Sequence, residues 1–125
     1  MRGVSSLLLA TCFLLPLVGC RPPADQGTLY ERIQAKAATV RLRACVEAGQ
    51  TGNREAMPLL VDRLSDVDAD VRMFAHMALK QISGKDFDWK PWDTDIARGH
   101  AVDRWRAWLA VQHQAHPPMA KGSTP

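Results

Sequence analysis

Three aspartates that alternate along a short stretch, Asp66, Asp68 and Asp70, are the first candidates for metal chemistry. An EF-hand calcium loop alternates its ligands in this way, but it also needs glycine at its sixth position and a bidentate glutamate at its twelfth. Counted from Asp66, these positions hold Val71 and Met77. We therefore expect no metal here. Asp68 instead suits the N-cap of a helix, and Asp70 its first turn, where negative charge favours the helix dipole.

Three histidines near the C-terminus are the other candidate metal ligands. His113 and His116 are three residues apart, a spacing that one helix face can present to a metal, and His100 is a candidate third ligand. The pair lies beside Pro117 and Pro118, where a helix should end, so we favour solvated histidines. The sequence shows no serine–histidine–aspartate or cysteine–histidine pattern and no glycine-rich phosphate loop. It therefore predicts no catalytic residue, no cofactor and no enzyme.

The N-terminus has the layout of an export signal. A basic start at Arg2 precedes an apolar run that ends in the sequence LVGC at residues 17–20. The run is shorter than the roughly 20 residues that span a bilayer, which is typical of a signal peptide. The motif resembles a bacterial lipobox, which implies that residues 1–19 are removed and that Cys20 carries lipid, palmitate included. The alternative is an ordinary cleaved signal with a chance cysteine.

The lipobox resemblance implies a protein held in the cell envelope by the lipid on Cys20. The next residue, Arg21, is not the aspartate associated with inner-membrane retention in some bacteria, so we expect the periplasmic face of the outer membrane. Residues 20–27 then form a polar, proline-containing tether. Cys12 would leave with the signal, so Cys45 would have no cysteine to pair with. We read Cys45 as a small buried hydrophobe.

The charge balance is weak, with 16 basic and 13 acidic side chains and a formal net charge of +3. It gives no support for nucleic acid as a partner, and an exported protein would not meet any. A mixture of arginine and tryptophan near the C-terminus would suit base stacking, but we favour core packing for it. The mixture comprises Arg98, Arg104, Trp105, Arg106 and Trp108.

Residues 28–114 read as one helical domain with no convincing strand. Thr28 and Glu31 form a capping box, and apolar residues then recur every three or four positions, which predicts a single helix to about Gly49. Three more helices are expected over about 54–64, 69–82 and 94–113. Residues 115–125 show no periodicity, and we expect them to form a disordered tail.

Residues 56–84 resemble a HEAT repeat of the short bacterial kind, also called phycobilisome-lyase-like. The shared features include Asp66 in the turn, Val71 followed by Arg72, and a closing Ile-x-Gly. The segment VRLRACVEA at Val40 returns 31 residues later as VRMFAHMAL, a period that suits stacked helix pairs. The resemblance implies an all-α fold, a short right-handed α-solenoid. It also implies that Asp66 and Arg72 form a hydrogen-bonded ladder between neighbouring repeats.

One clear repeat and one partial repeat are too few for a stable core, since about three are normally needed. We therefore expect the tryptophan-rich C-terminal helix to close the solenoid, with Trp105 and Trp108 packed on the helix expected over 69–82. The candidate interaction surface combines connector and helix side chains: Trp89, Trp92, His76 and Lys80. We read His76 and Lys80 as part of a solvated helix face, and the alternative for Trp89 and Trp92 is that they fold with Phe87 over the open end of the solenoid.

The HEAT resemblance implies a function in binding other proteins. The expectation is a membrane-anchored lipoprotein that acts as an adaptor or scaffold, with an unidentified envelope protein as its partner. The alternative is a small ligand- or metal-binding lipoprotein that uses the tryptophan connector or the C-terminal histidines.

Overall fold

The computed structural model describes residues 26–117, and these contain helices but no β-strand. The elements in chain order are α1 (Leu29–Ile33), α2 (Ala38–Gln50), a short 3-10 helix η2 (Arg54–Ala56), α3 (Met57–Arg63), α4 (Ala69–Ser83) and α5 (Asp95–Ala115). The expected signal peptide, the lipid site at Cys20 and residues 118–125 of the expected tail lie outside the described residues.

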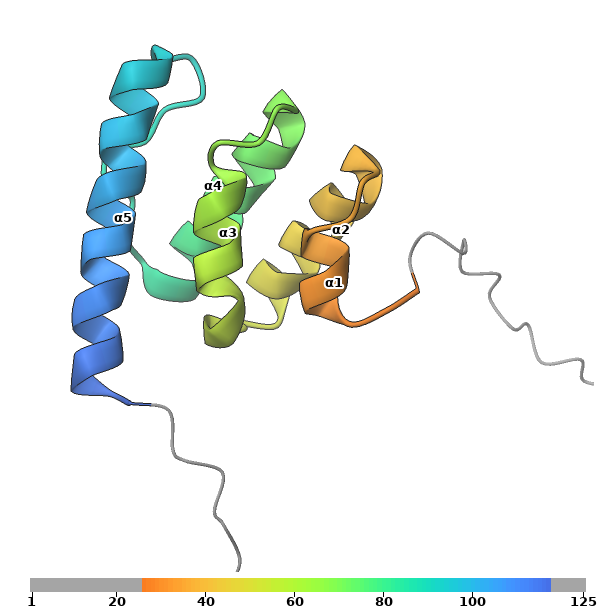
Figure 1. Ribbon diagram of the computed structural model, residues 1–125, viewed down its shortest axis with the longest axis horizontal. Helices are drawn as coiled ribbons and strands as arrows, with labels where there is room; N and C mark the ends of the chain where they lie inside the picture. Colours follow the sequence, from red (N-terminus) through yellow and green to blue (C-terminus); the bar gives the residue numbers. More distant parts are fainter. Residues whose placement is uncertain (1–25, 118–125) are drawn as a thin grey trace, which may run out of the picture.

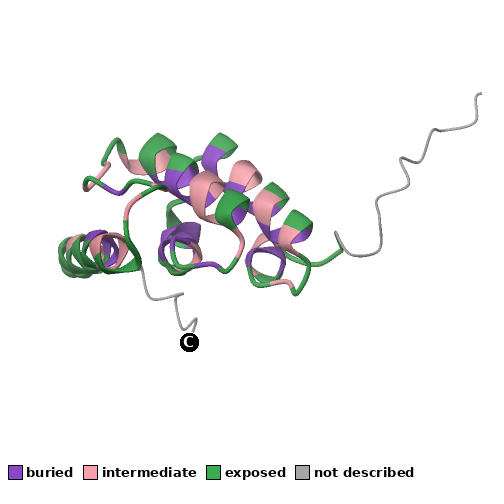
Figure 2. Ribbon diagram, turned by 90° about the horizontal axis from the view of Figure 1, so that it is seen from above, coloured by how far each residue is buried: buried purple, intermediate pink, exposed green. Residues whose placement is uncertain are grey.

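The helices form two layers (Figure 1). α1, α3 and α5 lie side by side in one layer, and α2 and α4 lie behind them in the other. The α1–α2 and α3–α4 hairpins pack most extensively through α2 and α4, while α5 packs on α3. Figure 2 shows the buried residues gathered where the layers face each other. The expected all-α solenoid is confirmed as two helix pairs followed by α5.

The N-terminal segment forms two helices, α1 and α2, where the apolar spacing predicted one. The break between them is held by Arg41, whose Nη1 donates to the carbonyl oxygens of Ala35 at 2.9 Å and Lys36 at 2.7 Å. Because a side chain satisfies these carbonyls, the backbone need not continue as a helix. The prediction of a single helix was wrong, and the first repeat is a complete helix pair.

The other helix ends follow their sequence signals. The side chain of Asp68 accepts hydrogen bonds from the backbone amides of Asp70 at 3.0 Å and Val71 at 3.1 Å, so it is the N-cap of α4. Gly84 ends α4 with a left-handed φ of 71°, which glycine adopts without a steric cost. Thr94 caps α5. The alternating aspartates thus begin a helix, as expected.

The interface between α2 and α4 is built from small residues. Ala44, Ala48, Ala75 and Ala78 are buried there with Gly49. A Cβ atom on Gly49 would lie 3.0 Å from the Cα of Ala78, so only glycine allows this approach without adjustment. The neighbouring thiol of Cys45 is fully buried, and burial raises its pKa to about 12. Cys45 is therefore an inert core residue.

Candidate functional site

The same arginine motif holds both hairpin turns of the solenoid. Nη1 of Arg72 donates to the carbonyl oxygens of Asp66 at 2.8 Å and Val67 at 3.3 Å. These carbonyls lie six and five residues before the arginine, the same offsets at which Arg41 binds its own turn. The internal repeat of 31 residues therefore corresponds to one repeated side-chain contact.

Asp66 connects the two turns. Its carboxylate accepts hydrogen bonds from Nε and Nη2 of Arg41 at 2.8 and 2.7 Å, from Arg63 at 3.2 Å and from the amide of Asp68 at 3.0 Å. Asp66 and Arg41 are 8% and 7% exposed. Burial opposes ionisation of the Asp66 carboxyl, but the bonds from Arg41 and Asp68 outweigh it and lower its pKa. The buried pair is therefore ionic.

The family resemblance implied Arg72 as the partner of Asp66, and Arg72 does bind the backbone carbonyl of Asp66, but a second arginine binds the carboxylate. Arg41 of the first repeat makes the contact between repeats, while Arg72 binds the backbone of its own turn. Sequence reasoning missed Arg41, although its alignment with Arg72 was the signal that identifies it. In a third repeat the equivalent of Asp66 would be residue 97, which is alanine. Within residues 26–117, Nε of Arg72 is accordingly buried without a hydrogen-bond partner.

The four residues of the candidate interaction surface do not form one exposed surface. Trp89 and His76 are 2% and 8% exposed, and their ring centroids lie 4.8 Å apart. Trp92 is 79% exposed, and the exposed Lys80 donates to Asp86 at 2.7 Å. The expected solvated position is wrong for His76, and Trp89 takes the alternative of folding over its neighbours, because the connector folds back on α4 and places the indole over the imidazole.

His76 is a buried imidazole that faces one carboxylate. Its Nε2 lies 3.6 Å from Oδ1 of Asp86, beyond hydrogen-bond distance, and has no hydrogen-bond partner within the described residues. Burial lowers the pKa of His76, and the carboxylate of Asp86 offsets part of that effect. His76 is therefore neutral at pH 7, and it acts as a flat surface on which Trp89 packs.

Aromatic rings attach α5 to the connector. Trp105 is fully buried, with its ring 4.7 Å from Phe87 in an edge-to-face arrangement and 5.9 Å from Trp108. Arg104 donates twice to the carbonyl oxygen of Phe87, at 3.1 and 2.8 Å. Phe87 and Asp88 have left-handed φ angles of 53° and 60°. For Phe87 this conformation costs about 1–2 kcal/mol, whereas aspartate adopts it more readily. The contacts with α5 offset that cost.

The packing of α5 differs from the expected packing on the helix over residues 69–82. The main helical neighbour of α5 is α3, and the ring of Trp105 meets the connector. Met77 of α4, by contrast, stays 53% exposed. The prediction of a cap was thus right in placing Trp105 in the core and wrong about what it packs on.

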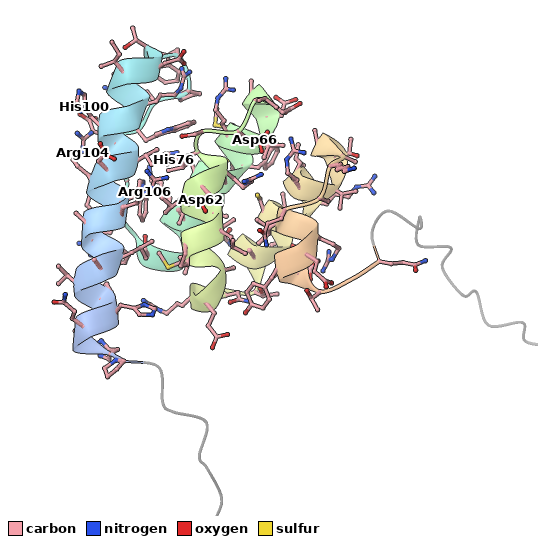
Figure 3. The ribbon with its side chains drawn as sticks, in the orientation of Figure 1. Asp62, Asp66, His76, His100, Arg104 and Arg106 are labelled. Atoms are coloured by element: carbon pink, nitrogen blue, oxygen red, sulfur yellow. The ribbon has the colours of Figure 1, made fainter. Side chains whose placement is uncertain are left out.

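A groove separates the C-terminal half of α5 from the N-terminal end of α3. α5 has 21 residues and α3 has 7, so α5 extends past its neighbour. The groove has a volume of about 630 Å³ and is lined by Arg54, Glu55, Met57, Pro58, Trp108, Leu109, Gln112, His113 and His116. It continues as a shallower depression along Asp62, Arg106 and Ala110. There an ion pair of 3.4 Å joins Arg106 to Asp62 across the two helices (Figure 3).

The three C-terminal histidines do not meet at one site. His113 and His116 line the groove, whereas His100 lies near the other end of α5 (Figure 3). The 13 residues from His100 to His113 span about 20 Å of helix. Among the residues that the structure describes, no group of three or more histidines, cysteines or acidic residues could hold a metal ion. The three-histidine site of the alternative interpretation is therefore not formed.

Comparison with known proteins identifies the family to which the two helix pairs belong. A model of HEAT repeats matches residues 28–90, just over half of the chain and both helix pairs. No curated protein and no solved structure matches the chain. No helix within residues 26–117 combines the length and the apolar character needed to cross a bilayer. The match covers Arg41, Asp66 and Arg72, so the contacts that join the two turns lie in the matched region. The chain belongs to the family of HEAT-repeat proteins.

Proposed function

We propose that this protein is a non-enzymatic adaptor that holds a partner protein at the membrane of the cell envelope. HEAT repeats generally mediate protein–protein interaction. The observation that carries the proposal is the groove beside α5, where Trp108 and Leu109 are only half-buried and Pro58 is exposed. Apolar surface of this kind, bordered by polar residues, is typical of a surface that binds another protein.

The buried polar side chains support binding rather than catalysis. Those of the described residues are Arg32, Arg41, Asp66 and His76. Arg32 pairs with Glu47 of α2 at 2.7 Å, Arg41 and Asp66 join the turns, and His76 supports the connector. Each of them holds two elements together, and such structural contacts account for the burial of these groups without a catalytic role.

The membrane anchor is the second part of the proposal. The LVGC motif supports cleavage before Cys20 and attachment of lipid to its sulfur, and the HEAT motif with Asp66 and Arg72 supports the short, phycobilisome-lyase-like subtype. Residues 21–27 would span at most about 25 Å when extended, so the solenoid would stay close to the membrane surface. The expected location is the periplasmic face of the outer membrane, with an envelope protein as the partner.

The adaptor function is tested by photocrosslinking in cells that make the protein. A photoreactive residue placed at the exposed position 110 should form one reproducible crosslinked product with another protein. Mass spectrometry of that product identifies the partner. Failure to recover any partner from positions on several faces of the solenoid would contradict the adaptor function.

The anchor is tested by Cys20→Ser, with Cys12→Ser as the matched control. The first variant should accumulate as an uncleaved precursor without lipid, because the lipid is expected on the thiol of residue 20. The second should be processed and lipidated like the parent. Normal cleavage and unchanged partition into membranes for Cys20→Ser would refute the lipoprotein interpretation.

A further inference from the structure

We propose that the groove between α3 and the C-terminal half of α5 binds a short amphipathic helix with an acidic end, and that the acidic end lies at Arg54, His113 and His116. This inference rests on the proposed adaptor function and specifies the chemistry of the partner.

The floor of the groove suits apolar side chains. Met57, Pro58, Trp108 and Leu109 lie together between the two helices, and Met57 is only 2% exposed. Trp108 is anchored from behind by the rings of Phe87 and Trp105, so it presents a fixed surface. Tryptophan held in this way is the residue type that most often dominates binding energy at protein interfaces.

The walls of the groove favour a helix over an extended segment. Both walls are helices, which have no row of free N–H and C=O groups along their sides, so neither offers an edge to which a strand could add. An extended segment would bury N–H and C=O groups without partners, whereas a helix satisfies its own. The stretch of α5 from Arg106 to His116 is about 15 Å long, which matches a helix of about ten residues.

The charges place the acidic end of that helix. At one end of the groove, Arg106 is already paired with Asp62 at 3.4 Å. At the other end, Glu55 accepts a hydrogen bond from the hydroxyl of Tyr30 at 3.0 Å.

The exposed Arg54 is in no ion pair within residues 26–117, and the exposed imidazoles of His113 and His116 lie on the same rim. An unpaired cation beside two imidazoles favours a carboxylate, and a carboxylate bound to arginine makes a charge-assisted hydrogen bond.

The test uses the purified full-length chain and a synthetic helix as the probe. The peptide is about twelve residues long and crosslinked to stay helical, with leucines at i, i+3, i+4 and i+7 and glutamates in both end turns. A second peptide carries lysines in place of the glutamates. Fluorescence anisotropy should show at least tenfold tighter binding of the acidic peptide, and Arg54→Glu should remove that preference. Equal binding of both peptides, or no binding of either, overturns the proposal.

Two exposed alanines of α5 provide a matched pair of variants. Ala110 lines the groove, and Ala107 does not. Both substitutions place a good helix former at an exposed position, so the fold should tolerate them equally. Ala110→Glu should weaken binding of the acidic peptide at least tenfold, and Ala107→Glu should leave it unchanged. Equal effects of the two variants would overturn the groove as the site.

The other occupants give distinct results. If a second copy of the chain fills the groove, sedimentation will show a dimer that Ala110→Glu dissociates. If the chain's own C-terminus fills it, the peptide will bind only after residues 118–125 are removed. Either result overturns the proposal.

The adaptor function can fail separately. The photoreactive residue is moved to Gln114 in the Ala107→Glu and Ala110→Glu variants. A partner that crosslinks equally to both keeps the function and rejects the groove. Peptide discrimination without any recovered partner keeps the groove and rejects the function.

Discussion

The two repeats and the C-terminal cap, which comprises the connector (residues 84–94) and α5, bury their interiors by different means. Between α2 and α4 the side chains are small and the helices approach closely at Gly49, while the buried Arg41–Asp66 pair fixes which turn meets which. The cap instead fills space with large rings. The indole nitrogens of Trp89 and Trp105 are buried without hydrogen-bond partners among the described residues. Buried polar contacts specify the repeats, whereas the buried part of the cap is held by ring packing and its polar contacts lie at the surface.

This difference explains why the repeats stop and where the groove arises. A further repeat would need a carboxylate at residue 97 to accept from Arg72, and alanine there leaves the arginine with only its own turn. The position of α5 is then set by aromatic packing near Trp105, about halfway along the helix. The half of α5 that follows Trp105 lies beside Met57 and Pro58 at the start of α3 and extends past them. The groove lies along this half of α5, where ring packing near Trp105 rather than a further ladder contact sets the position of the helix.

The largest expected effect comes from the cap. Trp105→Ala should destabilise the protein by about 3–5 kcal/mol, because it removes a fully buried indole and leaves a cavity. That is a large share of the roughly 5–15 kcal/mol that stabilises a domain. Urea unfolding followed by circular dichroism measures the loss. Trp92→Ala, at a position 79% exposed, is the control and should change stability by no more than about 0.5 kcal/mol. A loss below about 1 kcal/mol for Trp105→Ala would show that the cap is not part of the core.

In the repeats, we expect substitutions of three charged residues to lower the unfolding free energy by decreasing amounts. Asp66→Ala leaves Arg41 buried without its carboxylate, for which we expect a loss of about 3–5 kcal/mol. Arg72→Ala removes charge-assisted bonds to two carbonyls, worth roughly 1.5–3 kcal/mol. Lys80→Ala breaks an exposed pair, worth at most about 1 kcal/mol. The same urea titrations rank the three variants, and equal losses for Arg72 and Lys80 would contradict the role of Arg72 at the turn.

The sequence predicted best the features that depend on near neighbours. The caps at Asp68, Thr94 and Gly84 act within one helical turn, and all three lie at their expected places. The break between α1 and α2 was missed because the apolar spacing continues through it, from Ile33 to Val40. What creates the break is a guanidinium that reaches back to carbonyls five and six residues away. Periodicity contains no record of such a contact.

The path of the connector and the position of the groove could not be predicted from the sequence pattern. His76 lies among charged residues, so its helix face reads as solvated until the connector covers it with Trp89. That reversal passes through positive φ at Phe87 and Asp88, and neither residue signals such a conformation as glycine would. The groove depends on the different lengths of α3 and α5 and on their placement, which are properties of the assembled helices.

Substitutions at two helical glycines compare the packing of the repeats with that of α5 through smaller changes in stability. Gly49→Val should destabilise by about 1–3 kcal/mol, because its Cβ would lie 3.0 Å from the backbone of Ala78 in the tightest part of the repeats. Gly99→Ala should stabilise by about 0.5–1 kcal/mol, because α5 has open space there and alanine is the better helix former. Thermal and urea unfolding measure the sign of the stability change for both variants. A stabilising Gly49→Val would mean that α2 and α4 are not closely packed.

The smallest effect is a pH dependence that arises at His76, where α4 meets the connector. Burial lowers the pKa of folded His76 below its ordinary value of about 6.5, while the unfolded chain titrates at that value. Between the two values the unfolded state binds more protons, so stability falls as the pH is lowered from about 6.5. His76→Phe keeps a ring beside Trp89 and should flatten the dependence of unfolding free energy on pH in this range.

A second variant should strengthen the pH dependence, because it removes a charge that faces His76. The carboxylate of Asp86 raises the pKa of His76, and the ammonium of Lys80 lowers it slightly. Asp86→Asn should therefore lower the pKa further and extend the loss of stability to lower pH. Urea titrations between about pH 5 and 7.5 separate the parent from both variants. The lowered pKa of Asp66 keeps its titration below this range, so it does not obscure the result. Identical pH profiles for the parent and His76→Phe would show that the imidazole is not held neutral beneath the connector.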